Sequence, residues 1–177
     1  MKKKVLSVVL TVAMLASLLV VPATAVSANR VDLQTLSFTE SDSTPTEGNE
    51  ISSVKPGDTF LVKVSFTSAE TVSIGGFNVK LSYDKNVFET YQYTDNDEEQ
   101  VGPISFAKPR NGFANSWSGE QNLKTDGIAI WNKTGTSYKN LEPDGQMTLG
   151  YLLLKVKDDA ENGSYNISFI LNDNKNY

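Results

Sequence analysis

The segment that decides the fold is IGGFNVKLSYD, which runs from Ile74 to Asp84. From Phe77 onwards, large apolar side chains occupy every second position of this segment and polar ones lie between them. The apolar positions are Phe77, Val79, Leu81 and Tyr83. A period of two is typical of a β-strand with one buried face. Asp84 follows at the end of the strand, where its side-chain oxygen can cap a turn.

The same alternation appears on the N-terminal side of this segment. Residues 29–38 read as a first strand, and the stretch 39–53, rich in Ser, Thr, Glu, Gly and Pro, reads as a loop. Lys55-Pro56-Gly57-Asp58 predicts a turn, because Pro presets φ and Gly accepts a positive φ. The next strand is predicted over 60–67, with its buried face formed by Phe60, Val62, Val64 and Phe66.

Further strands are predicted towards the C-terminus, with no sustained helical period between them. They cover 87–93, 104–107, 113–117, 127–132, 147–157 and 165–171. Asp144-Gly145 predicts a turn, and Asn162-Gly163 predicts a tight hairpin between the last two strands. Short strands with frequent turns indicate an all-β protein, a jelly-roll β-sandwich of about eight to nine strands.

The first 28 residues are predicted to be a signal peptide. A basic start at Lys2–Lys4 precedes an apolar run from Val5 to Val21, and small residues follow at Ala23-Thr24-Ala25 and again at Val26-Ser27-Ala28. An uncleaved membrane anchor is the alternative, because the apolar run almost spans a bilayer. Either interpretation predicts a secreted or cell-surface protein whose folded domain covers residues 29–177.

The composition excludes several kinds of chemistry. The chain has no cysteine and no histidine, so it offers neither a Ser-His-Asp triad, a cysteine nucleophile, a thiolate or imidazole zinc site, nor a disulfide. After removal of residues 1–25, 13 basic residues remain against 21 acidic ones, a net charge of −8. An acidic domain is a poor partner for nucleic acid or anionic lipid.

Three stretches together resemble the cohesin family. Residues 54–60 resemble the opening of a cohesin domain, and 74–89 resemble its glycine-aromatic strand ending in Tyr-Asp. Asp144-Gly145, the apolar strand to Val156 and the stretch 162–169 resemble its later hairpin. The resemblance implies a non-catalytic module that binds dockerin modules on the flat face of one sheet, in cellulosome-type assembly for polysaccharide breakdown. It implies no metal or cofactor of its own. The family's sandwich closes with a ninth strand, and the polar stretch 172–177 predicts that this strand is absent from the sequence.

Alternation then places the candidate partner-binding residues. If Phe77, Val79 and Leu81 point inward, the even-numbered positions of that strand point outward. If Ile128 and Ile130 are buried, their neighbours face solvent, and the resemblance places the last strand on the same sheet. The candidates are Gly76, Asn78, Lys80, Ser82, Ala129, Trp131, Asn166, Ser168 and Ile170.

The sequence is also compatible with other functions. A carbohydrate-binding module would need two or three coplanar exposed aromatic rings, for which the candidates are Trp117, Trp131, Tyr91, Tyr93 and Tyr138. A cell-surface adhesion domain is a further alternative. A glycosidase would need two facing carboxylates, and no pair of acids lies on facing strands by pattern. The acidic stretch Asp95–Glu99 lacks the glycine that a calcium-binding EF-hand loop requires, so we interpret it as a solvated loop.

Overall fold

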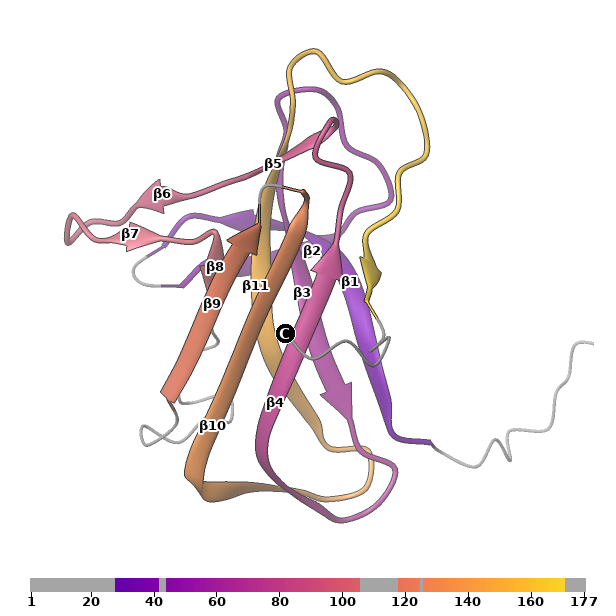
Figure 1. Ribbon diagram of the computed structural model, residues 1–177, viewed down its shortest axis with the longest axis vertical. Helices are drawn as coiled ribbons and strands as arrows, with labels where there is room; N and C mark the ends of the chain where they lie inside the picture. The colour runs from indigo at the N-terminus through magenta and orange to yellow at the C-terminus, as the bar shows by residue number, and fades with distance from the viewer. Residues whose placement is uncertain (1–27, 42–43, 106–117, 125, 171–177) are drawn as a thin grey trace, which may run out of the picture.

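The computed structural model of the chain describes residues 28–41, 44–105, 118–124 and 126–170, and the regular elements of these ranges are β-strands (Figure 1). In chain order they are β1 (Arg30–Thr39), β2 (Thr46–Glu50), β3 (Thr59–Thr67), β4 (Val72–Ser82), β5 (Phe88–Thr90), β6 (Tyr93–Thr94), β7 (Gln100–Val101), β8 (Ile104–Ser105), β9 (Ser118–Lys124), β10 (Ile128–Leu141), β11 (Gln146–Val156) and β12 (Ser168–Phe169). The all-β prediction is confirmed. These ranges contain no helix long and apolar enough to cross a membrane.

Two antiparallel sheets pack face to face as a sandwich (Figure 1). The larger sheet has the strand order β2-β1-β3-β11-β5, and β8 pairs with another part of β11. The smaller sheet has the order β12-β4-β10-β9, and β6 pairs with β7 in a separate short hairpin. Strands that are neighbours in the chain often belong to different sheets, so most pairings join residues distant in sequence.

The core lies between the two sheets and follows the predicted alternation. The inward side chains of β3 and β4, including Phe60, Val62, Val64, Val79 and Leu81, are almost fully buried. Those of β11 that face them are buried as well. Each such side chain contributes about 1.5–3 kcal/mol of hydrophobic stabilisation. The predicted core faces of β3 and β4 are therefore confirmed.

Trp131 of β10 joins the two sheets through the core. Its side chain is fully buried, and its indole Nε1 donates a hydrogen bond of 3.0 Å to the carbonyl oxygen of Leu149 on β11. The pairing of β11 with β3 shifts at this point, so Leu149 is the extra residue of a β-bulge. Gly150 follows with φ of 145°, and a Cβ there would lie 2.8 Å from the indole nitrogen. The bulge and the glycine make room for the indole ring.

The outer face of the larger sheet is partly covered by its own loops. Leu36, Leu61 and Leu153 are adjacent across three strands and buried, although they point away from the central core. The chain around β6 and β7 crosses this row, since a Cβ on Gly102 would lie 3.4 Å from Leu153 Cδ2. The ring of Phe38 lies 6.3 Å from that of Tyr93 in the same covering layer. This part of the outer face is therefore closed to a partner.

A carboxylate side chain holds strand β2 against the outer face of the larger sheet. The Tyr151 hydroxyl donates a hydrogen bond of 2.6 Å to Glu47 Oε1, and Lys63 Nζ lies 2.8 Å from Glu47 Oε2. Tyr151 is almost fully buried, and burial together with the hydrogen bond to Glu47 raises the pKa of its phenol above the ordinary value of 10.0. The three side chains tie β2 to β3 and β11 in addition to its backbone pairing with β1.

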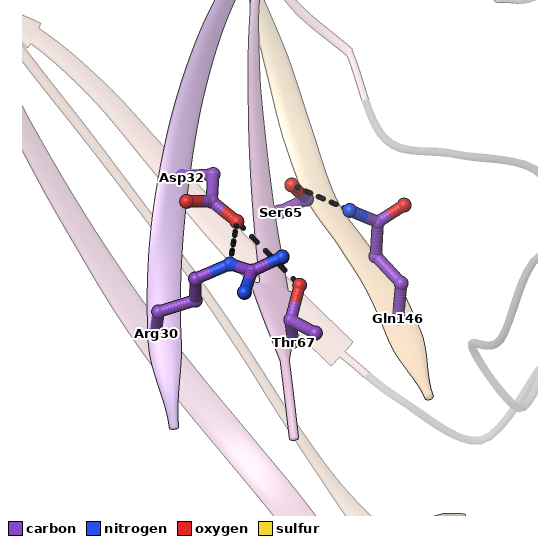
Figure 2. Close-up of polar contacts among 5 residues, drawn as sticks. All are labelled: Arg30, Asp32, Ser65, Thr67 and Gln146. Atoms are coloured by element: carbon purple, nitrogen blue, oxygen red, sulfur yellow. Dashed lines mark hydrogen bonds and ion pairs between the residues drawn. The ribbon is translucent and has the colours of Figure 1, made fainter. Parts of the chain in front are cut away.

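The remainder of that outer face is polar. Figure 2 shows Asp32 of β1 accepting contacts from Arg30 Nε at 2.9 Å and from Thr67 Oγ1 at 3.5 Å. Beside them, Gln146 Nε2 of β11 lies 3.4 Å from Ser65 Oγ of β3. The Arg30 and Asp32 side chains are 61% and 37% exposed, so their ion pair adds little to stability. This end of the face carries hydroxyl, amide and ionic groups.

The turns predicted from the sequence are present at the predicted positions. Asp58 N donates to Lys55 O at 3.0 Å, with Gly57 at a φ of 88°. Asp84 Oδ1 accepts a hydrogen bond of 2.9 Å from Asn86 N, which is the cap expected at the end of β4. Gly145 N donates to Glu142 O at 2.8 Å and closes the turn between β10 and β11.

Two expectations about local structure were wrong. The stretch 39–53 is not a loop throughout, because the polar residues of β2 pair with the end of β1. Asn162-Gly163 does not form a hairpin: β11 ends in the larger sheet, whereas β12 pairs with β4 in the smaller one. The chain between them crosses from one sheet to the other, and Tyr165 packs against Gly163 and donates to Glu161 O at 2.9 Å.

The predicted signal peptide and the strand expected over 113–117 lie outside the described residues, apart from Ala28 at the end of the former. The division of the chain at residue 28 remains a prediction. It follows from the sequence pattern alone.

Replacement of Trp131 by Ala should lower the free energy of unfolding by about 3–5 kcal/mol, because it removes a buried ring and leaves the Leu149 carbonyl without its donor. Urea unfolding followed by far-UV circular dichroism measures this change. Tyr138→Ala is the aromatic control, because that side chain is 72% exposed and its loss should change stability by less than about 0.5 kcal/mol. Equal losses in the two variants would contradict the assigned role of Trp131.

Stability should also fall at alkaline pH through Tyr151. A phenol whose pKa is raised on folding stabilises the protein below its ordinary pKa of 10.0, and this contribution is lost as pH rises beyond that value. Tyr151→Phe removes the ionisable group, so its urea midpoint should fall less between pH 9 and pH 12 than that of the wild type. A fall of the same size in both proteins would contradict this.

Candidate functional site

The candidate site is the outer face of the four-stranded sheet, which β9, β10 and β4 present towards the viewer in Figure 1. Its centre is formed by two neighbouring strands in fixed register. Asn132 of β10 lies opposite Asn78 of β4, Ile130 opposite Lys80, and Ile128 opposite Ser82. These positions are fixed by the paired backbones of the two strands, and they do not depend on the conformation of a loop.

Strand β4 presents its candidate residues as the sequence predicted. Val79 and Leu81 point into the core, so Asn78, Lys80 and Ser82 face outward. Asn78 is exposed, and the other two are half-buried among their cross-strand neighbours. The outward placement of these three residues is confirmed, while their contact with a partner remains a prediction.

Gly76 has a role in packing between strands. A Cβ at this position would lie 2.9 Å from the carbonyl oxygen of Lys133 and 3.0 Å from Thr134 Cγ2. A side chain here would push β4 away from β10. The burial of Lys133 close by lowers the pKa of its amine. Gly76 thus allows the two strands to approach, whether or not it also touches a partner.

The orientation predicted for β10 was wrong. Ala129 and Trp131 are both fully buried, and the side chains that face outward are Ile128 and Ile130. Ala129 lies opposite Leu81 and Trp131 opposite Val79, so both point inward with the core residues of β4. The indole of Trp131 fills the space above the β11 bulge, and this packing fixes the direction of every side chain along this part of β10. Ala129 and Trp131 are therefore removed from the candidate face.

Strand β12 completes one side of the face. Ser168 pairs with Ser82, and the two hydroxyl oxygens lie 3.1 Å apart. Ile170 N donates a hydrogen bond of 2.9 Å to the carbonyl oxygen of Lys80. Asn166 is exposed but precedes the paired residues of β12. Ser168 and Ile170 therefore lie beside β4 at the edge of the face, and the contact of all three candidates with a partner remains a prediction.

Strand β9 forms the other side of the face. Asn122 pairs with Ile130 and is exposed to solvent. Outward-facing residues that the sequence reasoning missed are Asn122, Ile128, Ile130 and Asn132. The face therefore has two half-buried isoleucines at its centre and amides, hydroxyls and an amine around them. An apolar centre within a polar rim is the pattern of a protein-binding surface.

The aromatic residues named for a carbohydrate-binding function do not form a platform in the described part of the chain. Trp131 and Tyr93 are buried, and the ring of Tyr91 packs 6.1 Å from that of Phe38. Tyr138 is exposed, and Trp117 lies outside the described residues. The described residues therefore do not form a surface of several coplanar rings on which sugars could stack.

The acidic residues have local structural roles. Glu89 on β5 lies 3.5 Å from Lys155 Nζ. It also lines an open pocket of about 470 Å³ together with Tyr83, Leu123 and Gly127, and among the described residues it is the one carboxylate in that lining. Asp95 Oδ1 accepts hydrogen bonds from the amides of Asp97 and Glu99, which forms the turn between β6 and β7. Within the described ranges, no three acidic side chains lie close enough together to hold a metal ion.

Comparison with known families agrees with this architecture. The family model for the cohesin domain matches residues 46–173, and the chain belongs to the cohesin family. A search of curated protein sequences gave no significant match.

Solved structures with a similar fold include two cohesins. The seventh ScaB type I cohesin from Pseudobacteroides cellulosolvens is 17% identical, with 67% of this chain and 68% of that chain covered and a TM-score of 0.45. A type II cohesin from Bacteroides cellulosolvens is 12% identical, with 70% and 75% covered and a TM-score of 0.48.

Proposed function

We propose that this protein is a secreted, non-catalytic binding module whose four-stranded sheet recognises the dockerin module of a secreted enzyme or scaffold protein. Membership of the cohesin family supports the kind of partner, and the face built on β4 and β10 supports the place of binding. The observation that carries the proposal is the pair Ile128 and Ile130, half-buried at the centre of a flat face and surrounded by polar groups. Such a pair gains stabilisation only when a partner covers it.

The size of the face suits a protein partner. Leu81 and Ser82 of β4 lie between paired residues of β12 and β10, and β9 pairs with the far side of β10, so this end of the surface is several strands wide. A standard interface buries about 800 Å² on each partner, which a sheet face of this width can supply. A backbone held in a sheet loses little conformational freedom on binding, which lowers the cost of association. Cellulosome-type assembly in polysaccharide breakdown is the cellular role that we propose.

A carbohydrate-binding module or an adhesion domain is a weaker proposal. Sugar rings stack on exposed aromatic rings, and among the described residues Tyr138 stands without a second ring beside it on the face. The signal peptide predicted for residues 1–28 supports secretion for either function.

Ile130→Asp should weaken binding to a cognate dockerin by about 30-fold or more, because it places a charge at the apolar centre, where a loss of 2 kcal/mol or more is typical. The measurement is isothermal titration calorimetry against the dockerins of the source organism. Gln146→Asp is the matched control, since it adds the same charge on the outer face of the other sheet (Figure 2). Tight binding of a glycan with no binding to any native dockerin would contradict the proposal.

Asn78→Asp should also weaken dockerin binding, because it converts an amide that donates and accepts hydrogen bonds into a group that only accepts. We expect a smaller loss than for Ile130→Asp, since Asn78 is exposed at the rim. Asn162→Asp carries the same chemical change at an exposed position of the crossing segment after β11, away from the candidate residues, and serves as the control. An unchanged dissociation constant for Asn78→Asp would remove this residue from the interface.

A further inference from the structure

Tyr138 is the most exposed of the large apolar side chains in the described part of the chain, with 72% of its surface accessible. It lies in a local irregularity of β10. Thr134 pairs with Gly76, and the next paired residue, Lys139, lies opposite Ile74. The four residues 135–138 thus stand opposite the single residue Gly75. The extra length leaves the regular ladder and presents Tyr138 to solvent.

The ring of Tyr138 rests on Gly75. A Cβ at position 75 would lie 2.9 Å from Cε1 of the ring, 3.1 Å from Cδ1 and 3.9 Å from Cζ. Any larger residue at this position would displace the ring, so the glycine allows the ring to contact the backbone of β4. The side chain is therefore held against the backbone of β4 while most of its surface remains open. An exposed ring that is already positioned loses less freedom when a partner covers it.

This ring continues the candidate binding face. Ile74 and Phe77 both pack against the core, which leaves Gly75 on the solvent side of β4. Gly75 precedes Asn78 by three residues, a distance of about 10 Å along a strand. Beyond it, exposed Ser73 and Asn140 share a hydrogen bond of 2.7 Å. Figure 1 shows β10 bending beneath the start of β4 at this end of the sheet.

We propose that Tyr138 is a second anchor for the protein partner, at the opposite end of the face from Ile128. This inference rests on the proposed dockerin-binding function. Ile130 lies opposite Lys80, and Tyr138 lies over Gly75, so the two apolar points are five positions apart along β4. That spacing is about 17 Å, which equals about 11 residues, or three turns, of an α-helix lying along β4. A helix of the dockerin lying along β4 would reach both points with two apolar side chains about three turns apart.

The test compares four variants in calorimetric titration with a cognate dockerin: Tyr138→Ala, Tyr138→Phe, Gly75→Ala and the double variant Gly75→Ala/Tyr138→Ala. We expect Tyr138→Ala to weaken binding about 10-fold or more, in the range of an aromatic anchor. Tyr138→Phe keeps the ring and should bind within about 2-fold of the wild type. Gly75→Ala should weaken binding because it displaces the ring. In the double variant, the alanine at position 75 should add no further loss, because the ring it displaces is already absent.

Tyr165→Ala is the matched control for the loss of an exposed tyrosine. Tyr165 is 36% exposed and lies in the crossing segment after β11, where its ring packs edge-on against Phe88. This variant should bind dockerin as the wild type does. Thermal unfolding of each variant verifies that the sandwich remains folded, which separates a lost contact from a lost structure.

The outcomes separate this inference from the function on which it rests. If Ile130→Asp abolishes dockerin binding and Tyr138→Ala leaves it unchanged, the second anchor is overturned while the proposed function stands. If no native dockerin binds the wild-type protein, both are overturned. If Tyr138→Ala abolishes retention on cellulose or xylan and leaves dockerin affinity unchanged, the ring belongs to a glycan subsite and the inference is overturned as well.

Discussion

The contact on which the rest of the structure depends is that between the Trp131 indole and the bulge of β11. The largest side chain of the core comes from the smaller sheet and donates its N–H group to a carbonyl of the larger one, across the interior of the sandwich. A buried indole without a hydrogen-bond acceptor would lose about 1–3 kcal/mol. The bulge supplies the acceptor, and Gly150 supplies the space. The two sheets are thereby joined by a directional contact as well as by apolar packing.

That contact also decides which residues of β10 reach the surface. Side chains alternate along a strand, so Trp131 in the core places Ala129 inside with it and puts Ile128, Ile130 and Asn132 outside. The inward position of a tryptophan therefore leaves two isoleucines exposed to a partner. A smaller residue at position 131 would remove the reason for the bulge and weaken the preference for this orientation. The composition of the candidate face follows from a packing requirement on its opposite side.

The sequence could predict β4 but not β10, for a physical reason. In β4, apolar and polar residues alternate, so one face is clearly the buried one. In β10, Ile128, Ala129, Ile130 and Trp131 are all apolar, and the pattern permits either face to be buried. Only the volume available above Gly150 decides between them, and that volume depends on a strand distant in the chain. The polar strand β2 and the crossing segment after β11 were missed for the same reason, since their structure depends on pairing partners rather than on local pattern.

The two outer faces of the sandwich differ in a way that favours the smaller sheet as the recognition surface. On the larger sheet, the leucine row lies beneath the chain around β6 and β7, and the remaining groups are already engaged in hydrogen bonds with one another (Figure 2). On the smaller sheet, the isoleucines of β10 are only half-covered. Covering them releases water from apolar surface, while the hydrogen-bonded groups of the other face would first have to lose their present partners. The free energy available for association is therefore concentrated on the sheet whose orientation Trp131 determines.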